Sequence, residues 1–143
     1  WSAKREAESQ HEVAEEQARE ARSNVMSFLK DMNPELHKKV TKVIQEIALT
    51  DGKIQKLRDL KEKHPNHGII DETLEQWQNL REQLNQVSGN LYHKVEGAYI
   101  AYEIDKIQGR NSLRLISKEL LKEANVALSN AEATRTIIEE QLR

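Results

Sequence analysis

Apolar residues recur at the spacing of an α-helix along almost the whole chain. Within residues 2–31, one series repeats every seven positions at Ala7, Ala14, Ala21 and Phe28. A second series lies between them, at His11, Ala18, Val25 and Met32. This is the a and d pattern of a coiled coil, with alanine at most of the seam. Alanine buries little apolar area but allows two helices to approach closely. The pattern therefore predicts a long, thin, paired helix.

Few residues interrupt the helical pattern, and their positions predict where the helices end. Asn33-Pro34 joins a good N-cap to a residue favoured at the first helical position. Residues 63–68 contain Pro, Asn and Gly and predict a loop, after which Asp71 is placed to cap the next helix. Gly109 and the residues after it offer a further break. We predict four helices, over about residues 2–31, 34–62, 71–108 and 112–142.

The seams at the two ends of the chain differ from those in the middle. The first helix and the later half of the last one place alanine at seam positions, whereas the middle helices use Leu, Ile, Val, Trp and Tyr. We expect the first and last helices to pair antiparallel as a thin stalk that carries both termini. The middle helices would form a hairpin that thickens the structure. The predicted fold class is all-α, an elongated antiparallel coiled coil or three- to four-helix bundle, with a compact four-helix bundle as the alternative.

Charge adds support for pairing of the middle helices. Residues 34–64 hold eight basic and five acidic residues, a balance of +3, and residues 65–108 hold three basic and seven acidic residues, a balance of -4. Opposite charges on neighbouring helices favour one register and orientation. Six lysines of the second helix are therefore interpreted as a solvated face beside an acidic neighbour; they are Lys38, Lys39, Lys42, Lys53, Lys56 and Lys63.

Composition narrows the function classes. The 143 residues include no Cys, two Pro, five Gly and 4% aromatic residues, with a net charge of -2. These values exclude disulfide and thiol chemistry and disfavour an all-β fold and a nucleic-acid binder. No apolar run reaches the length of a membrane span. The chain begins at Trp1 and ends at Arg143 without a helix-stop signal, which predicts a single coiled-coil module within a larger protein.

The chain carries no motif that predicts catalysis. It contains no glycine-rich phosphate loop and no nucleophile elbow. His64 and His67 precede Asp71 and Glu72, but a zinc site needs three or four convergent ligands, and this spacing supplies two. We expect no enzyme activity and no catalytic, cofactor or metal site.

A protein partner is the expected ligand, with a homodimer left open. The third helix is apolar on more than one face, which is typical of a helix covered by several neighbours or by a partner. Tyrosine is enriched at protein interfaces. The candidate partner-binding residues are Tyr92, Tyr99, Tyr102, Ile100, His64 and His67.

Two resemblances bear on function. The stretch from His37 to His64, followed by Leu74, Trp77, Leu80 and Leu84, resembles the second and third helices of a spectrin repeat. Residues 1–25 and 122–142 resemble the alanine-rich stalk of the helical-hairpin receptor-binding domain of colicin-type bacteriocins, which implies a receptor-binding tip. Neither resemblance carries a diagnostic motif, so neither assigns the chain to a family.

These observations favour a non-catalytic coiled-coil module that acts as a spacer and as a protein–protein interaction domain. Two alternatives remain open. One is a bacteriocin or toxin receptor-binding arm, and the other is a spectrin-like or ATPase-arm scaffold segment.

Overall fold

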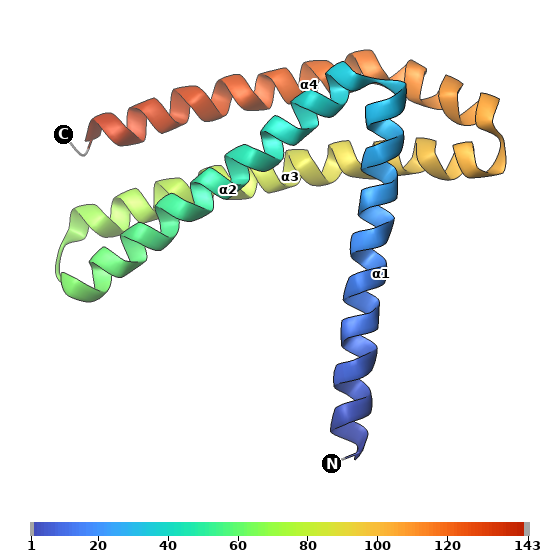
Figure 1. Ribbon diagram of the computed structural model, residues 1–143. Coiled ribbons are helices and arrows are strands. Elements are labelled where there is room, and N and C mark those ends of the chain that lie inside the picture. Colours follow the sequence, from blue (N-terminus) through green and yellow to red (C-terminus); the bar gives the residue numbers. More distant parts are fainter. Residues whose placement is uncertain (1, 142–143) are drawn as a thin grey trace.

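The computed structural model describes residues 2–141, which form four α-helices and no strand (Figure 1). The helices are α1 (Ser2–Met32), α2 (Pro34–Lys63), α3 (Gly68–Ile104) and α4 (Lys106–Gln141). The predicted all-α helical bundle is confirmed. Trp1, Leu142 and Arg143, which the sequence analysis used at the chain ends, lie outside the described residues.

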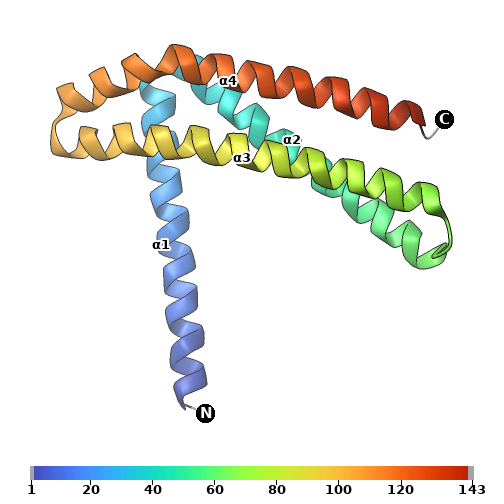
Figure 2. The ribbon, with the colours of Figure 1, turned by 180° about the vertical axis from the view of Figure 1, so that it is seen from behind.

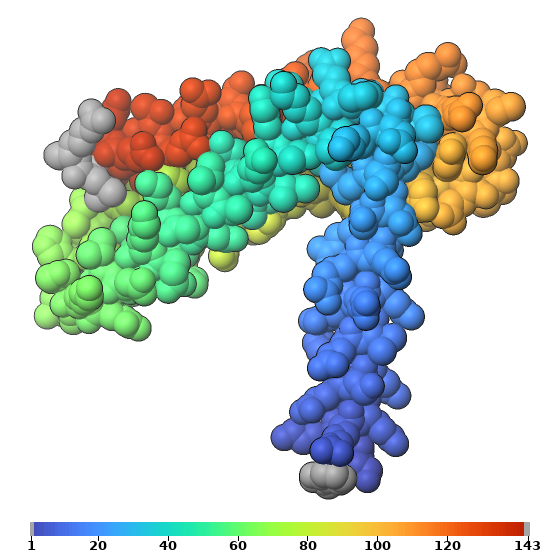
Figure 3. Space-filling view, in the orientation of Figure 1, coloured from blue at the N-terminus to red at the C-terminus, as the bar shows by residue number. Residues whose placement is uncertain are grey.

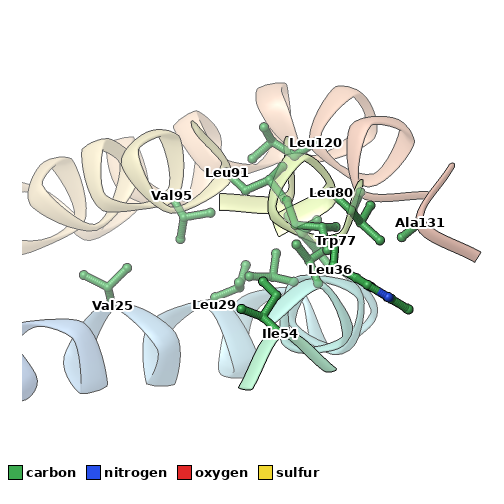
Figure 4. Packing of buried hydrophobic residues seen from close by; sticks show 14 of the residues in the cluster. Val25, Leu29, Leu36, Ile54, Trp77, Leu80, Leu91, Val95, Leu120 and Ala131 are labelled. Carbon is green, nitrogen blue, oxygen red and sulfur yellow. The ribbon is translucent and has the colours of Figure 1, made fainter. Parts of the chain in front are cut away.

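Helices α2, α3 and α4 pack together as a three-helix bundle. Each of the three contacts both of the others, and short connections make consecutive helices antiparallel. Their seams meet in one apolar core, in which Leu36 and Leu91 are fully buried and Trp77 is 2% exposed. Figure 4 shows Leu80, Leu91 and Leu120 converging with Trp77 from α3 and α4. The seams of the middle helices therefore form the centre of the molecule.

The predicted stalk of the first and last helices is not formed. Ala124, Ala127 and Ala131 of α4 are buried within the bundle, and the last two lie beside Leu80 and Leu84 of α3. An alanine seam accepts any closely approaching helix, and the leucines of α3 occupy this one. The two termini lie far apart (Figure 1).

Helix α1 packs against the bundle only through its last two turns. Val25, Phe28 and Leu29 are buried, and Met26 and Met32 pack beside them. Figure 4 shows Val25 directed toward Val95 of α3. All residues from 2 to 24 are exposed, and in Figure 3 this segment stands away from the rest of the molecule. We call residues 2–24 the arm.

Two predicted helix boundaries are wrong. The third helix ends at Ile104 and the fourth begins at Lys106, so Gly109 lies inside a helix. The side chain of Asp105 accepts hydrogen bonds from the backbone N–H groups of Ile107 (3.0 Å) and Gln108 (3.3 Å), which caps α4.

The start of α3 also differs from the prediction. This helix begins at Gly68, so Asp71 lies in its first turn and does not cap it. Asp71 instead forms an ion pair with Lys61 at 2.9 Å, which links the ends of α2 and α3. The predicted loop is confirmed at residues 64–67, and the predicted cap of α2 is confirmed because the side chain of Asn33 accepts a bond from the Leu36 amide at 3.1 Å.

Candidate interaction surfaces

An aromatic cluster joins α1 to the bundle. The ring of Phe28 lies 5.5 Å from that of Tyr99 and 4.9 Å from that of Tyr102, at tilts of 56° and 44°. Both distances fall in the range preferred by aromatic pairs. We call Phe28, Tyr99 and Tyr102 the elbow cluster. Since Tyr102 and Tyr99 are half-buried in it, much of their surface serves a contact within the chain.

Two tyrosine hydroxyls in this region have perturbed acidity. Burial raises the pKa of Tyr92, and the neighbouring carboxylate of Glu96 raises it further, against a smaller opposing effect of Arg22. A hydrogen bond to Glu103 is the main cause that raises the pKa of Tyr99, with burial second. Both hydroxyls therefore stay protonated as donors to helix carboxylates on α3.

The structure separates the candidate residues into two groups. Tyr92, Tyr99, Tyr102 and Ile100 lie on the last third of α3, where Ile100 is 55% exposed. His64 and His67 are exposed in the loop that precedes α3. About 25 residues of helix, or roughly 37 Å at 1.5 Å per residue, lie between the groups. They cannot contribute to one compact site.

The turn between α3 and α4 exposes an apolar tip. Ile104 is 80% exposed and Ile107 is 70% exposed, and Ile100 lies one helical turn before Ile104. Single exposed apolar residues are common, but three within eight positions form an exposed apolar surface.

The arm is a long helical segment that the rest of the chain does not cover. Its alanine seam lies on the same face as Val25 and Phe28, which are buried against the bundle. Ala7, Ala14, Ala18 and Ala21 are nevertheless all exposed. At the seam position of His11, the imidazole lies 3.1 Å from Glu15 one turn later. The seam therefore continues beyond the interface that the same chain covers.

Sequence reasoning did not single out the arm, because it paired this seam with α4. The signal that could have found it is the step in side-chain size along α1. The seam changes from alanine to Val25, Phe28 and Met32 at the position where the bundle begins to cover it. This change in side-chain size coincides with the end of the covered part of α1.

The named lysines of α2 are exposed except for the half-buried Lys39, as predicted for a solvated face, but they do not all lie beside α3. Lys61 pairs with α3, whereas Lys53 lies 3.9 Å from Glu139 of α4. In a second α2–α3 ion pair, the basic residue lies on the acidic helix, because Arg81 of α3 binds Asp51 of α2 at 3.2 Å. The strongest link between α2 and α4 is Arg135, which donates two hydrogen bonds to the carboxylate of Glu46 at 2.8 and 3.1 Å.

Within residues 2–141, no group of three or more His, Asp or Glu side chains is placed to hold a metal ion. In the same part of the chain, every helix is too short in apolar sequence to cross a lipid bilayer. No known family model, curated protein or solved structure matches the sequence or the fold. The surfaces themselves therefore carry the functional argument.

Proposed function

We propose that this protein is a non-catalytic helical module that serves as a spacer and as a protein–protein contact. The arm is the contact element, and the three-helix bundle is the base that holds it. The observation that carries the proposal is the uncovered alanine seam of residues 2–24, which continues the buried face of Val25 and Phe28. A partner helix would extend a packing surface that the chain has already begun.

The length and composition of the arm support this role. Its 23 residues span about 35 Å at 1.5 Å per residue. A single helix of this length is only marginally stable in water, and packing of an apolar face supplies most helical stability in proteins. Alanine at the seam allows close approach of a second helix. The arm is thus suited to set the distance between the bundle and a bound helix.

A scaffold segment is a second candidate function. It is favoured by the up–down–up order of α2, α3 and α4, in which each helix contacts the other two. A long helix that leaves the bundle, as α1 does, could join such a segment to a neighbouring one. A colicin-type receptor-binding hairpin has less support, because α1 and α4 do not form the stalk on which that comparison depends.

Site-specific photo-cross-linking tests the proposal. A photoreactive amino acid replaces Ala14 on the seam in one variant and Ser9 on the outer face in another. Both residues are exposed, so neither replacement disturbs the bundle. After irradiation in the producing cells, we expect covalent protein adducts from position 14 and few from position 9. Equal yields from both positions, or none from either, would contradict the proposed contact role.

A further inference from the structure

A groove runs along the face of the bundle between α3 and α4. It consists of three adjoining hollows of about 430, 70 and 220 Å³. The first two share Val87, Ala127 and Asn130, and the last two share Leu80 and Gln83. All lining residues come from α3 and α4. The groove extends over residues 119–138 of α4, or about 29 Å of helix.

The groove has the features of an unfilled helix-binding surface. Its floor includes Ala127 and Ala131, and its apolar rim residues Val126 and Ile137 are 51% and 57% exposed. The middle hollow is the smallest, so the groove fits a helix with small seam residues. At one end lies Gln76, whose buried side-chain oxygen Oε1 has no hydrogen-bond partner. Buried polar atoms of this kind normally have a partner.

The arm of the same chain lies on the other side of the bundle. Helix α1 contacts α2 and α3 and passes in front of α3 in Figure 1 but behind it in Figure 2. The groove lies on the face of α3 and α4 to which α1 and α2 contribute no lining residue. The buried contacts of Phe28 keep the arm on its own side. An arm in the groove must therefore come from another molecule.

We propose that the arm of a second copy of this chain docks in the α3–α4 groove, so that two or more copies assemble by arm exchange. The two surfaces match in length and in side-chain size. The arm spans about 35 Å and the groove about 29 Å, and an alanine seam meets a narrow, alanine-lined floor. A fourth helix would cover the exposed side chains of Val126 and Ile137.

Charge does not select the orientation of the docked arm. The charged lining of the groove consists of Glu119, Lys122 and Glu123 at one end, and the remaining lining residues are uncharged. The arm carries two basic residues near each end, together with six glutamates, so four basic and six acidic residues give it a net charge of -2. In either orientation, both cations and glutamates of the arm lie near this end of the groove, so length and side-chain size carry the match. The amides of Gln10 and Gln17 on its flank supply hydrogen-bond donors for a groove edge rich in Gln and Asn.

Pairing between two arms is less favourable. A parallel pair would bring the second arm into the bundle, which occupies the seam face from Val25 onward. An antiparallel pair with full overlap would place Glu8 of one arm beside Glu15 of the other, twice per dimer. Like charges at these flanking positions disfavour a coiled-coil pairing.

Disulfide trapping tests the docking, since the chain has no cysteine of its own. Full-length Ala14→Cys and Asn130→Cys variants are mixed under mild oxidation. Both residues are exposed in the structure, so both variants are expected to fold. We expect a disulfide-linked pair of the two variants. It should form at least about tenfold faster than with Ser9→Cys in place of Ala14→Cys, because docking raises the effective concentration of the thiols.

This inference rests on the proposed function of the arm, and the outcomes separate the two. Links only between two Ala14→Cys chains, or equal rates with Ser9→Cys, would overturn docking in the groove. Photo-adducts from position 14 with other proteins but not with this chain would overturn self-docking and leave the contact role of the arm intact. The absence of any adduct and of any disulfide would overturn both.

Discussion

Single residues decide where α1 stops packing and where α4 starts. Phe28 places its ring between two tyrosines of α3 and is 5% exposed, so it fixes the last turns of α1 on the bundle. Gly109 lies against the backbone of Tyr102, and a Cβ atom added to Gly109 would collide with it. These two positions shape the elbow and the α3–α4 turn.

We expect Phe28→Ala to lower the free energy of unfolding by about 3–5 kcal/mol, the cost of removing a buried aromatic ring and leaving a cavity. Urea denaturation measures this change. Ser27→Ala, one residue earlier and exposed, should change stability by less than about 0.5 kcal/mol. A cost below about 1 kcal/mol for Phe28→Ala would show that the elbow cluster is not packed as described.

Two glycine-to-alanine changes in helices should have opposite effects. Gly109→Ala forces a methyl group into Tyr102, and overpacking of this kind costs about 1–3 kcal/mol. Gly97→Ala meets nothing within 4 Å and should stabilise α3 by about 0.5–1 kcal/mol, because alanine is the better helix former. Thermal unfolding of the two variants measures both. A stabilising Gly109→Ala would contradict the close approach of α4 to Tyr102.

The tyrosines predict a loss of stability in alkali. Because Tyr92 and Tyr99 have raised pKa values in the folded protein, their contribution is complete below the unfolded value of about 10. It is lost as the pH rises through the folded pKa values. We expect ultraviolet titration to show tyrosine ionisation at higher pH in the folded than in the urea-unfolded chain. In a variant with both Tyr92→Phe and Tyr99→Phe, this difference should shrink; an unchanged difference would refute the assignment.

At the residue scale, the sequence predicted helix ends better than it predicted the tertiary contacts of single residues. Asn33-Pro34 ends α1 as predicted. The predicted helix break at Gly109 was wrong, because Gly109 allows α4 to approach Tyr102 closely and does not form a turn. The start of α4 could have been predicted from Asp105 and from Gln108 three positions later, since this pair resembles a capping box. Thr50 interrupts the seam of α2 but is buried, because its hydroxyl donates to the carbonyl of Glu46 at 2.8 Å.

At the element scale, periodicity predicted the helices but not their partners. The alanines at 124, 127 and 131 are compatible with any close neighbour, so the pattern alone could not choose between α1 and α3. Pairing depends on which helix the short turn at Asp105 brings back along α4. Of the candidate site residues, Tyr99 and Tyr102 were noticed for their apolar face, but their contact with Phe28 requires the crossing of α1, which no local pattern encodes.

The arm and the bundle should differ in amide hydrogen exchange. The arm amides are protected only by the hydrogen bonds of their own exposed helix, whereas the amides around Leu91 lie in the buried core. We expect residues 2–24 to exchange far faster than residues 84–98 in dilute solution, because local opening needs little free energy where few apolar contacts are buried. Equal protection of the two segments would contradict an uncovered arm.

Raising the protein concentration provides the matched comparison for this experiment. If arms dock in grooves of other copies, protection of residues 2–24 should increase with concentration, and Val126→Glu at the groove rim should prevent the increase. Protection that increases equally in this variant would place the arm on a different surface.

At the scale of the whole molecule, the protein is a three-helix base from which one helix leaves (Figure 1). Its exposed apolar side chains are distributed over the arm, the isoleucine tip and the α3–α4 groove. In this arrangement a chain with a modest core leaves long helical surfaces uncovered. The central claim is that the arm is not covered by its own chain.

Distance measurement between two spin labels tests this claim most directly. Ser9→Cys in the arm and Thr136→Cys near the end of α4, both exposed, are labelled in one chain and diluted into excess unlabelled protein. The structure predicts a distance between the two labels that is far beyond the ~10 Å spacing of packed helices, even when the length of the label side chains is added. A dominant short distance, with α1 lying along α4, would contradict the account.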